Sequence, residues 1–335
     1  MLREAATVER AGERVQARMD QVHALLGEDL AAVDLELARL AREGLSPATD
    51  SAAHLLEAGG KRVRPLTVLL SAACFGEVPA AARDVAVVAE LVHLATLLHD
   101  DVIDDGQERR GRTTSRRIWG NAVSVLAGDL LLTHALERTA AVAPSVLMDL
   151  FATLRRLVDG EVVQLRGRAT LDVTEETYFR IVQGKTASLF AWAARAGGTL
   201  AGASPRAVDA LGEFGSRVGL AFQLVDDALD YGGDPRATGK ALFVDLAEGK
   251  LTLPLIRAIA ARPELLADVE AVRAGDARAA ERVGEAVRAA GVCDGVRALA
   301  AAETERALSA LQVLPAGTAR DLLASIAGEL AARVR

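Results

Sequence analysis

Residues 86–104 of this chain are AVVAELVHLATLLHDDVID. Their apolar side chains recur every three or four positions, which is the period of an α-helix, and the predicted helix ends in aspartates of the form DDxxD. Residues 218–230, VGLAFQLVDDALD, repeat this arrangement. No stretch of the chain alternates apolar and polar residues for long enough to predict a sheet, so the two acidic helices indicate an all-α protein.

The composition and the residues that mark helix ends support helices along the whole chain. Of the 335 residues, 51% are hydrophobic but only 3% are aromatic, so Ala, Leu and Val must supply the core. Ser46-Pro47 and Ser204-Pro205 each predict a helix start, and Gly197-Gly198 predicts a helix end. We expect about ten or more helices in a single domain, residues 1–335, with a motif-bearing core at about 55–256.

Several classes of protein are disfavoured. The net charge of −7 is opposite in sign to that of a typical nucleic-acid binder. Cys74 and Cys293 are isolated, so neither a disulfide framework nor a CxxC zinc site is expected. The charged N-terminus does not resemble a secretory signal, and no segment reaches the roughly 18–20 apolar residues that span a bilayer. The expected protein is soluble and cytoplasmic.

The two acidic motifs predict metal binding. Asp100 and Asp104 share one face of a helix because they are four positions apart, and Asp101 lies beside them. Asp226, Asp230 and Asp227 repeat this spacing further along the chain. Crowded carboxylates repel one another unless a cation joins them, and a hard ion such as Mg²⁺ prefers such oxygen ligands together with phosphate oxygens. The alternative, helices that simply end in solvent, does not explain two matched copies.

Basic residues near glycines and near the acidic motifs predict an anionic ligand that carries phosphate. The segment GGKRVRP, residues 59–65, places Lys61 and Arg64 on one helix face, and Arg109 and Arg110 follow the first acidic motif. Residues 184–186, GKT, resemble the end of a P-loop, but Phe179 stands where that motif needs its first glycine. A P-loop nucleotide site is therefore not expected.

Six blocks together resemble the trans-prenyltransferases, which are head-to-tail isoprenyl diphosphate synthases. The resemblance runs from about Leu55 to Ile256 and follows the order of the blocks in that family. It implies an isoprenoid-synthase-type bundle of antiparallel helices around a deep apolar cavity, usually as a homodimer. The blocks are GGKRVRP, LLHDDVIDDGQERRG, GEVVQL, GKTASLF, AFQLVDDALDY and GKALFVDLAEGKLTLPLI.

The resemblance also implies a reaction and its residues. An allylic diphosphate ionises, isopentenyl diphosphate attacks the carbocation, and a proton is lost, with two or three Mg²⁺ ions bound to the substrate diphosphate. The implied metal ligands are Asp100, Asp104 and Asp226, supported by Asp101, Asp227 and Asp230. Isopentenyl diphosphate would be held by Lys61, Arg64, His93 and Arg110. The allylic diphosphate would be held by Arg109, Lys185, Thr186, Gln223 and Lys240.

Residues before the first acidic motif bear on product length. In the family, aromatic side chains four and five positions before that motif stop elongation early, whereas this chain has Thr96 and Ala95. This resembles the long-chain enzymes that make quinone side chains, around octaprenyl in length, and Phe151 is a candidate tunnel floor. One departure is visible, because the family commonly has Gly where this chain has Phe243.

Other functions stay open. The chain could be a short-chain synthase that makes farnesyl or geranylgeranyl diphosphate, or a partner-dependent subunit of a heteromeric synthase. A terpene cyclase on the same fold is disfavoured, because both DDxxD motifs and the GGKRVRP block are intact. The expected partners are isopentenyl and allylic prenyl diphosphates and a second copy of the chain. No nucleic acid is expected, and transient membrane contact would serve product release.

Overall fold

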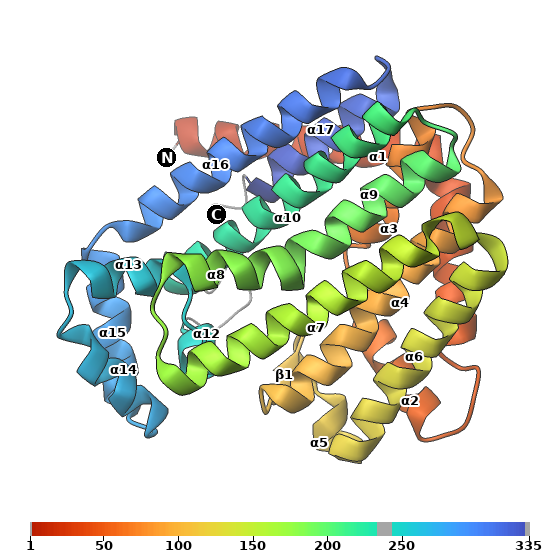
Figure 1. Cartoon of the computed structure of the whole chain (residues 1–335). Helices are drawn as coiled ribbons and strands as arrows, with labels where there is room; N and C mark the ends of the chain where they lie inside the picture. Colours follow the sequence, from red (N-terminus) through yellow and green to blue (C-terminus); the bar gives the residue numbers. More distant parts are fainter. Residues whose placement is uncertain (1, 233–242, 332–335) are drawn as a thin grey trace. The chain divides into compact units, whose positions relative to one another are not determined.

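A computed structural model describes residues 2–232 and 243–331, and its elements are almost all helical (Figure 1). This confirms the predicted all-α class. The first half of the chain contains α1 (Leu2–Leu40), α2 (Ala48–Glu57), α3 (Val63–Ala73), α4 (Ala80–Ile103), β1 (Glu108–Arg109), β2 (Arg112–Thr113), α5 (Ser115–Trp119), α6 (Asn121–Val142), η1 (Pro144–Val146) and α7 (Leu147–Thr170).

The second half is also helical. It contains α8 (Glu175–Val182), η2 (Gln183–Ala187), α9 (Ser188–Leu200), α10 (Pro205–Gly232), α12 (Val244–Ala247), α13 (Leu253–Ala261), α14 (Leu265–Arg273), α15 (Ala277–Ala289), α16 (Val292–Ala310), η3 (Leu311–Val313) and α17 (Thr318–Ala331). None of the helices in the described ranges is long and apolar enough to cross a membrane.

The chain divides into two compact units. The first comprises residues 1–147, 196–208 and 314–325, and the second comprises residues 148–195, 209–313 and 326–335. A single domain over residues 1–335 stays a prediction.

The first unit is built around α4. This helix is apolar on most of its surface and packs against α3 and α6, which lies beside it in Figure 1. Leu91, Leu94 and Leu98 of α4 are fully buried. Gly128 of α6 allows a close approach, because a Cβ atom there would collide with the His99 ring. The tight packing fixes the direction of α4, whose last turn carries the first acidic motif.

A short hairpin interrupts the helices just after α4. Its strands, β1 and β2, pair antiparallel, with Glu108 opposite Thr113. The two residues of the turn, Arg110 and Gly111, both have left-handed backbones with φ of 53° and 73°. That geometry is typical of the two-residue turns that match the twist of a hairpin. The expectation of no sheet misses this pair, because two-residue strands are too short to show alternation.

The second unit has its core where α8, α10, α13, α15 and α16 meet. Tyr231, Leu224 and Val283 are fully buried there. Gly215 of α10 faces the Phe190 carbonyl of α9, and a Cβ on Gly219 would lie 2.6 Å from the Ala187 Cα. Small residues at these positions therefore let α10 pack closely against α9 and the turn before it.

The predicted helix ends are only partly right. The Ser204 hydroxyl accepts a hydrogen bond from the Ala207 amide at 3.3 Å, as expected of a residue that caps α10. Ser46 instead donates to the Asp50 carboxylate at 2.6 Å, and α2 begins only at Ala48. The helix end predicted at residues 197–198 is wrong, because α9 continues to Leu200.

Candidate active site

The first acidic motif lies at the C-terminal end of α4. Asp100 is in the last turn, Asp104 is the residue that ends the helix, and both are partly buried. The Asp104 amide still donates to the Asp100 carbonyl at 2.8 Å, so the helical spacing of the two is retained. The last turn contains no basic residue. Because a helix C-terminus already carries partial negative charge, carboxylates there favour a cation.

The middle aspartate of this motif is turned into the protein. Asp101 is only 1% exposed, and its Oδ1 accepts hydrogen bonds from the Arg109 Nε at 2.9 Å and Nη2 at 2.7 Å. Its backbone carbonyl accepts from the Gly106 amide at 2.9 Å. Asp101 therefore ties the hairpin that carries Arg109 to the end of α4, and the structure pairs two of the predicted site residues with each other.

A cluster of positive charge lies near the first motif. The pKa of His93 is held well below its usual range, first by burial and then by the charges of Arg64 and Arg110. Burial lowers the pKa of Arg64 to about 10, and the neighbouring Arg110 adds to this. Three of the four residues predicted to hold isopentenyl diphosphate are thus close together, and the fourth, Lys61, is exposed in the loop before α3. Neutral His93 can donate a hydrogen bond without adding charge.

Glu90 is a buried countercharge of this cluster, and its role was not predicted from the sequence. Its carboxylate accepts from the Arg62 Nη1 at 2.9 Å, while the Arg62 Nε donates to Asp34 at 2.9 Å. A Cβ on Gly60 would lie 2.9 Å from the Arg110 Nη1 and 3.0 Å from the Arg62 Nη1. Gly60 therefore leaves room for two guanidinium groups. A charged residue inside an otherwise apolar helix is the sequence feature that could have identified Glu90.

The second acidic motif, at the end of α10, repeats the pattern of the first. Asp226 and Asp230 are partly buried, whereas Asp227 is 1% exposed. Asp227 accepts hydrogen bonds from the Tyr178 hydroxyl at 2.6 Å and from the Gln223 Nε2 at 2.7 Å. Burial, followed by the negative charge of Asp245, raises the pKa of Asp227 to about 8. In both motifs the middle aspartate is an internal anchor and the outer two are more accessible.

Lys185 and Thr186 lie on an irregular helical turn. Residues 183–187 form a π-helical segment between α8 and α9, and such segments are frequent at functional sites. Lys185 forms an ion pair with Glu161 of α7. The Thr186 hydroxyl donates to the Gln223 Oε1 at 3.0 Å, and Gln223 in turn contacts Asp227. Glu161 belongs to the GEVVQL block, but sequence reasoning gave it no role.

The loop that returns to the second motif carries Asp245 and Lys250. Their Oδ1 and Nζ atoms are 3.4 Å apart, and Lys250 also pairs with Glu248. Lys240, which was predicted to hold the allylic diphosphate, lies outside the described residues.

The donor set fits Mg²⁺ bound together with a phosphate ligand. Among the described residues, no three Asp, Glu, His or Cys side chains converge on a preformed metal site. Mg²⁺ commonly uses only one or two protein carboxylates and takes further oxygens from substrate phosphates and water. At the second motif the negative charge of Asp245 adds to the effect of burial in raising the pKa of Asp227, and a cation bound nearby would offset that negative charge.

The predicted chain-length residues lie in different surroundings. Ala95 is 2% exposed inside α4, and the hydroxyl of the neighbouring Thr96 donates to the His93 carbonyl at 2.8 Å. Phe151 of α7 is instead 42% exposed in the single chain, next to Met148, which is 72% exposed. A role for Phe151 as a tunnel floor would therefore require another group to cover it.

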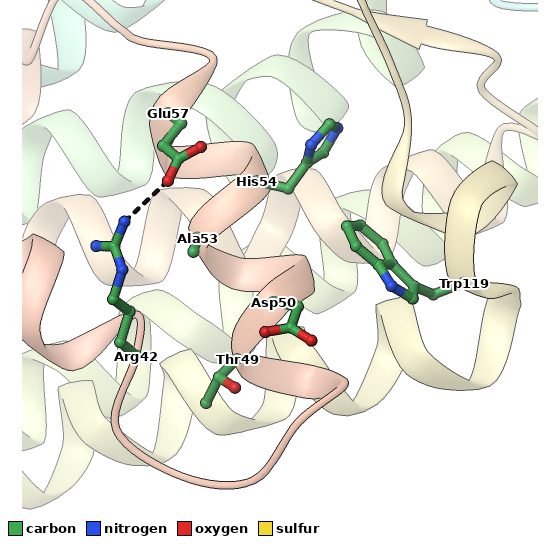
Figure 2. A pocket seen from close by; sticks show the side chains of 7 residues that line it. All are labelled: Arg42, Thr49, Asp50, Ala53, His54, Glu57 and Trp119. Carbon is green, nitrogen blue, oxygen red and sulfur yellow. Dashed lines mark hydrogen bonds and ion pairs between the residues drawn. The ribbon is translucent and has the colours of Figure 1, made fainter.

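A hollow of about 540 Å³ in the first unit contains none of the predicted site residues (Figure 2). The Arg42 Nη2 donates to Glu57 at 2.8 Å across one wall. The His54 ring meets Trp119 edge to face, with 5.4 Å between their centroids. The side chains that line it are Arg42, Thr49, Asp50, Ala53, His54, Glu57 and Trp119. The acidic motifs, rather than this hollow, carry the candidate chemistry.

Comparisons with known proteins point to one family. The family model described as "Polyprenyl synthetase" matches residues 47–290. The octaprenyl diphosphate synthase of Escherichia coli K12 is 36% identical over 242 residues, which are 72% of this chain and 75% of that protein. Heptaprenyl diphosphate synthase component 2 of Geobacillus stearothermophilus is 40% identical over 244 residues, 72% of this chain and 76% of that protein.

The fold has close relatives among solved structures. A polyprenyl synthase from Caulobacter crescentus, complexed with calcium and isoprenyl diphosphate, has a TM-score of 0.88 and 37% identity. The match covers 94% of this chain and 98% of that one.

Proposed function

This chain belongs to the polyprenyl synthetase family, and we propose that it adds isopentenyl diphosphate repeatedly to an allylic diphosphate. The family confirms the predicted trans-prenyltransferase, and it confirms that the protein is an enzyme. The observation that carries the proposal is the matched pair of acidic helix ends, each with one buried aspartate and two more accessible ones.

The accessible aspartates are the proposed metal ligands. Asp100, Asp104 and Asp226 would hold two or three Mg²⁺ ions together with the substrate diphosphate, and Asp230 would support them. Bound Mg²⁺ would neutralise the charge that develops on the leaving diphosphate. The buried Asp101 and Asp227 act differently, because their hydrogen bonds to Arg109, Tyr178 and Gln223 hold each motif in position.

The basic cluster around His93 is the proposed subsite for isopentenyl diphosphate. Arg64 and Arg110 are close enough to lower the pKa of His93, and the buried Glu90 carboxylate pairs with the neighbouring Arg62. A diphosphate would bring negative charge to this cluster and accept hydrogen bonds from both arginines. Lys61, in the adjoining loop, would provide a further contact.

The allylic diphosphate is proposed to bind where cations are held in place by carboxylates. Arg109 is held by Asp101, and Lys185 is held by Glu161. Because these cations are already oriented, little reorganisation is needed when charge develops on the diphosphate. Thr186, Gln223 and Lys240 complete this proposed set. We propose that the released diphosphate accepts the proton that is lost after condensation.

Ala95 and Thr96 support a long product, because neither would block a growing chain beneath the first motif. We propose a polyprenyl diphosphate near octaprenyl in length, for quinone side chains, made in the cytoplasm. The product would leave through transient contact with a membrane, which accepts its apolar chain.

An exposed apolar stripe on α7 supports a homodimer. Its members are spaced three, four or seven positions apart and therefore lie on one helix face. They are Met148, Phe151, Val158, Val162 and Leu165, with exposures between 40% and 72%. A second copy of the chain would bury this stripe and cover Phe151. Val158→Glu should convert the dimer into a monomer in light scattering, and an unchanged mass would contradict this interface.

A partner-dependent subunit is the second candidate function. The relative from Geobacillus stearothermophilus is named as component 2 of a heptaprenyl diphosphate synthase. Activity of the purified single chain separates the two candidates. With Mg²⁺, farnesyl diphosphate and labelled isopentenyl diphosphate, the label should enter polyprenyl diphosphate, and a chelator should stop the incorporation. No incorporation at saturating Mg²⁺ would refute autonomous activity.

A further inference from the structure

Phe243 has a backbone conformation that residues other than glycine rarely adopt. Its φ is +64°, in the left-handed region. Its amide donates to the Asp230 carbonyl at 3.0 Å, and Asp230 is the last aspartate of the second motif. A residue persists in this strained region only where its surroundings compensate for the strain. The contacts of the Phe243 side chain supply that compensation.

The Phe243 ring packs against Gly284 and Arg288 of α15 and against Tyr231, and we call this packing site its seat. A Cβ on Gly284 would overlap the ring, so only glycine leaves room for it. The Arg288 guanidinium lies 5.1 Å from the ring centroid, within the range of a cation–π contact. The Tyr231 ring is tilted by 49° at 5.9 Å. Gly284 is buried inside a helix, where glycine is less stable than alanine, so the seat explains why glycine stands there.

The seat fixes the short segment that carries Asp245. Asp245 is two residues after Phe243, and the Lys250 amide donates to its carbonyl at 2.8 Å. Leu246 is buried in the same core as Tyr231. The segment is thus anchored at the second acidic motif by the Phe243 amide on Asp230 and in the core by the buried Leu246. From this segment the negative charge of Asp245 acts on Asp227.

We propose that Phe243 is a positioning residue: its ring, seated on Gly284 between Tyr231 and Arg288, holds Asp245 beside the second acidic motif and thereby strengthens divalent cation binding there. The inference rests on the proposed function for the role of that cation. A glycine at position 243 would leave this segment free to change conformation, whereas the Phe243 ring in its seat restrains it.

The seat can be disturbed from either side. Gly284→Ala places a methyl group under the ring, and Phe243→Ala removes the ring. The matched control is Gly295→Ala, because Gly295 is also a helical glycine but its nearest neighbour would be an ordinary 3.6 Å from an added Cβ. Phe243→Tyr retains the ring and should therefore behave like the unaltered chain.

Mn²⁺ binding is measured by titration calorimetry with inorganic diphosphate present, and exchange of the Phe243 amide is followed by hydrogen–deuterium exchange. Gly284→Ala and Phe243→Ala should each weaken Mn²⁺ binding about tenfold, equivalent to about 1.4 kcal/mol, and speed exchange of that amide. The double variant should be no worse than either single variant, because both break one contact. Gly295→Ala should change neither measurement.

Equal Mn²⁺ affinities for Gly284→Ala and Gly295→Ala would overturn the inference, and so would additive effects in the double variant. If the proposed function is wrong, the unaltered chain itself will transfer no prenyl group, and this result is distinct from equal Mn²⁺ affinities. If the inference holds, the KM for isopentenyl diphosphate stays unchanged in both seat variants, since that substrate is assigned to the His93 cluster. A general loss of folding would instead change every kinetic constant and the melting temperature together.

Discussion

Gly60→Ala tests the proposed isopentenyl diphosphate subsite without removing a charge. The added methyl group would lie 2.9 Å from the Arg110 Nη1 and 3.0 Å from the Arg62 Nη1, whereas ordinary contacts begin at 3.4 Å. Both guanidinium groups must therefore withdraw by about half an ångström. They are the flexible ends of long side chains, so the fold should tolerate the change.

The expected cost can be worked out from the contact that is disturbed. A hydrogen bond to a charged group contributes about 1.5–3 kcal/mol. Displacing Arg110 without removing it should lose part of this, about 1.4 kcal/mol, which corresponds to about a tenfold change in binding. Steady-state kinetics at saturating farnesyl diphosphate should therefore show a KM for isopentenyl diphosphate raised about tenfold, with kcat within about twofold.

Gly59→Ala is the matched control. An added Cβ there meets nothing within 4 Å, but the residue has a φ of +79°. The variant should lose about 1–2 kcal/mol of stability through backbone strain while retaining the KM. An unchanged KM in Gly60→Ala would refute the placement of this subsite, as would equal increases in both glycine variants.

Three further predictions concern the site, and a fourth concerns Glu36 of α1, which forms ion pairs with Arg39 and Arg138. Asp100→Ala should nearly abolish turnover while the chain stays folded by circular dichroism; full activity at saturating Mg²⁺ would contradict the metal assignment. Arg110→Ala should raise mainly the KM for isopentenyl diphosphate, and Arg109→Ala that for the allylic substrate; identical substrate profiles would count against separate subsites. Ala95→Phe should shorten the product with little change in melting temperature, and an unchanged product length would identify Ala95 as ordinary packing. Hydrogen bonding to arginines lowers the pKa of Glu36 to about 2 from 4.5. The ionised Glu36 therefore stabilises the folded chain above pH 4.5, and this contribution is lost as the pH falls towards 2. The destabilisation by Glu36→Gln, measured by thermal melting, should shrink over that range, and a constant difference would contradict it.

The helices and the acidic motifs could be predicted because their patterns are local. The period of apolar residues in α4 and α10 depends only on helix geometry, and so does the four-residue spacing of Asp100 and Asp104. The same spacing could not show that Asp101 is buried, because its orientation depends on Arg109, which returns through the hairpin. That hairpin itself escaped prediction because its strands have two residues each.

The partners of the basic residues could not be predicted from local patterns either. Glu90 and Arg62 are brought together by the packing of α3 on α4, and Lys185 pairs with Glu161 of α7. Such contacts join residues that are far apart in sequence, so no spacing rule reveals them. The sequence did mark Phe243 as a departure from the family, but its seat on Gly284 became visible only in the structure.

The central claim is that this single chain extends an allylic diphosphate into a long polyprenyl diphosphate. The most direct test is mass spectrometry of the products that the purified chain makes from farnesyl diphosphate, excess isopentenyl diphosphate and Mg²⁺. We expect a main product near eight isoprene units, with shorter species only as intermediates. A main product of four units or fewer would contradict the long-chain assignment, and no product would contradict the claim as a whole.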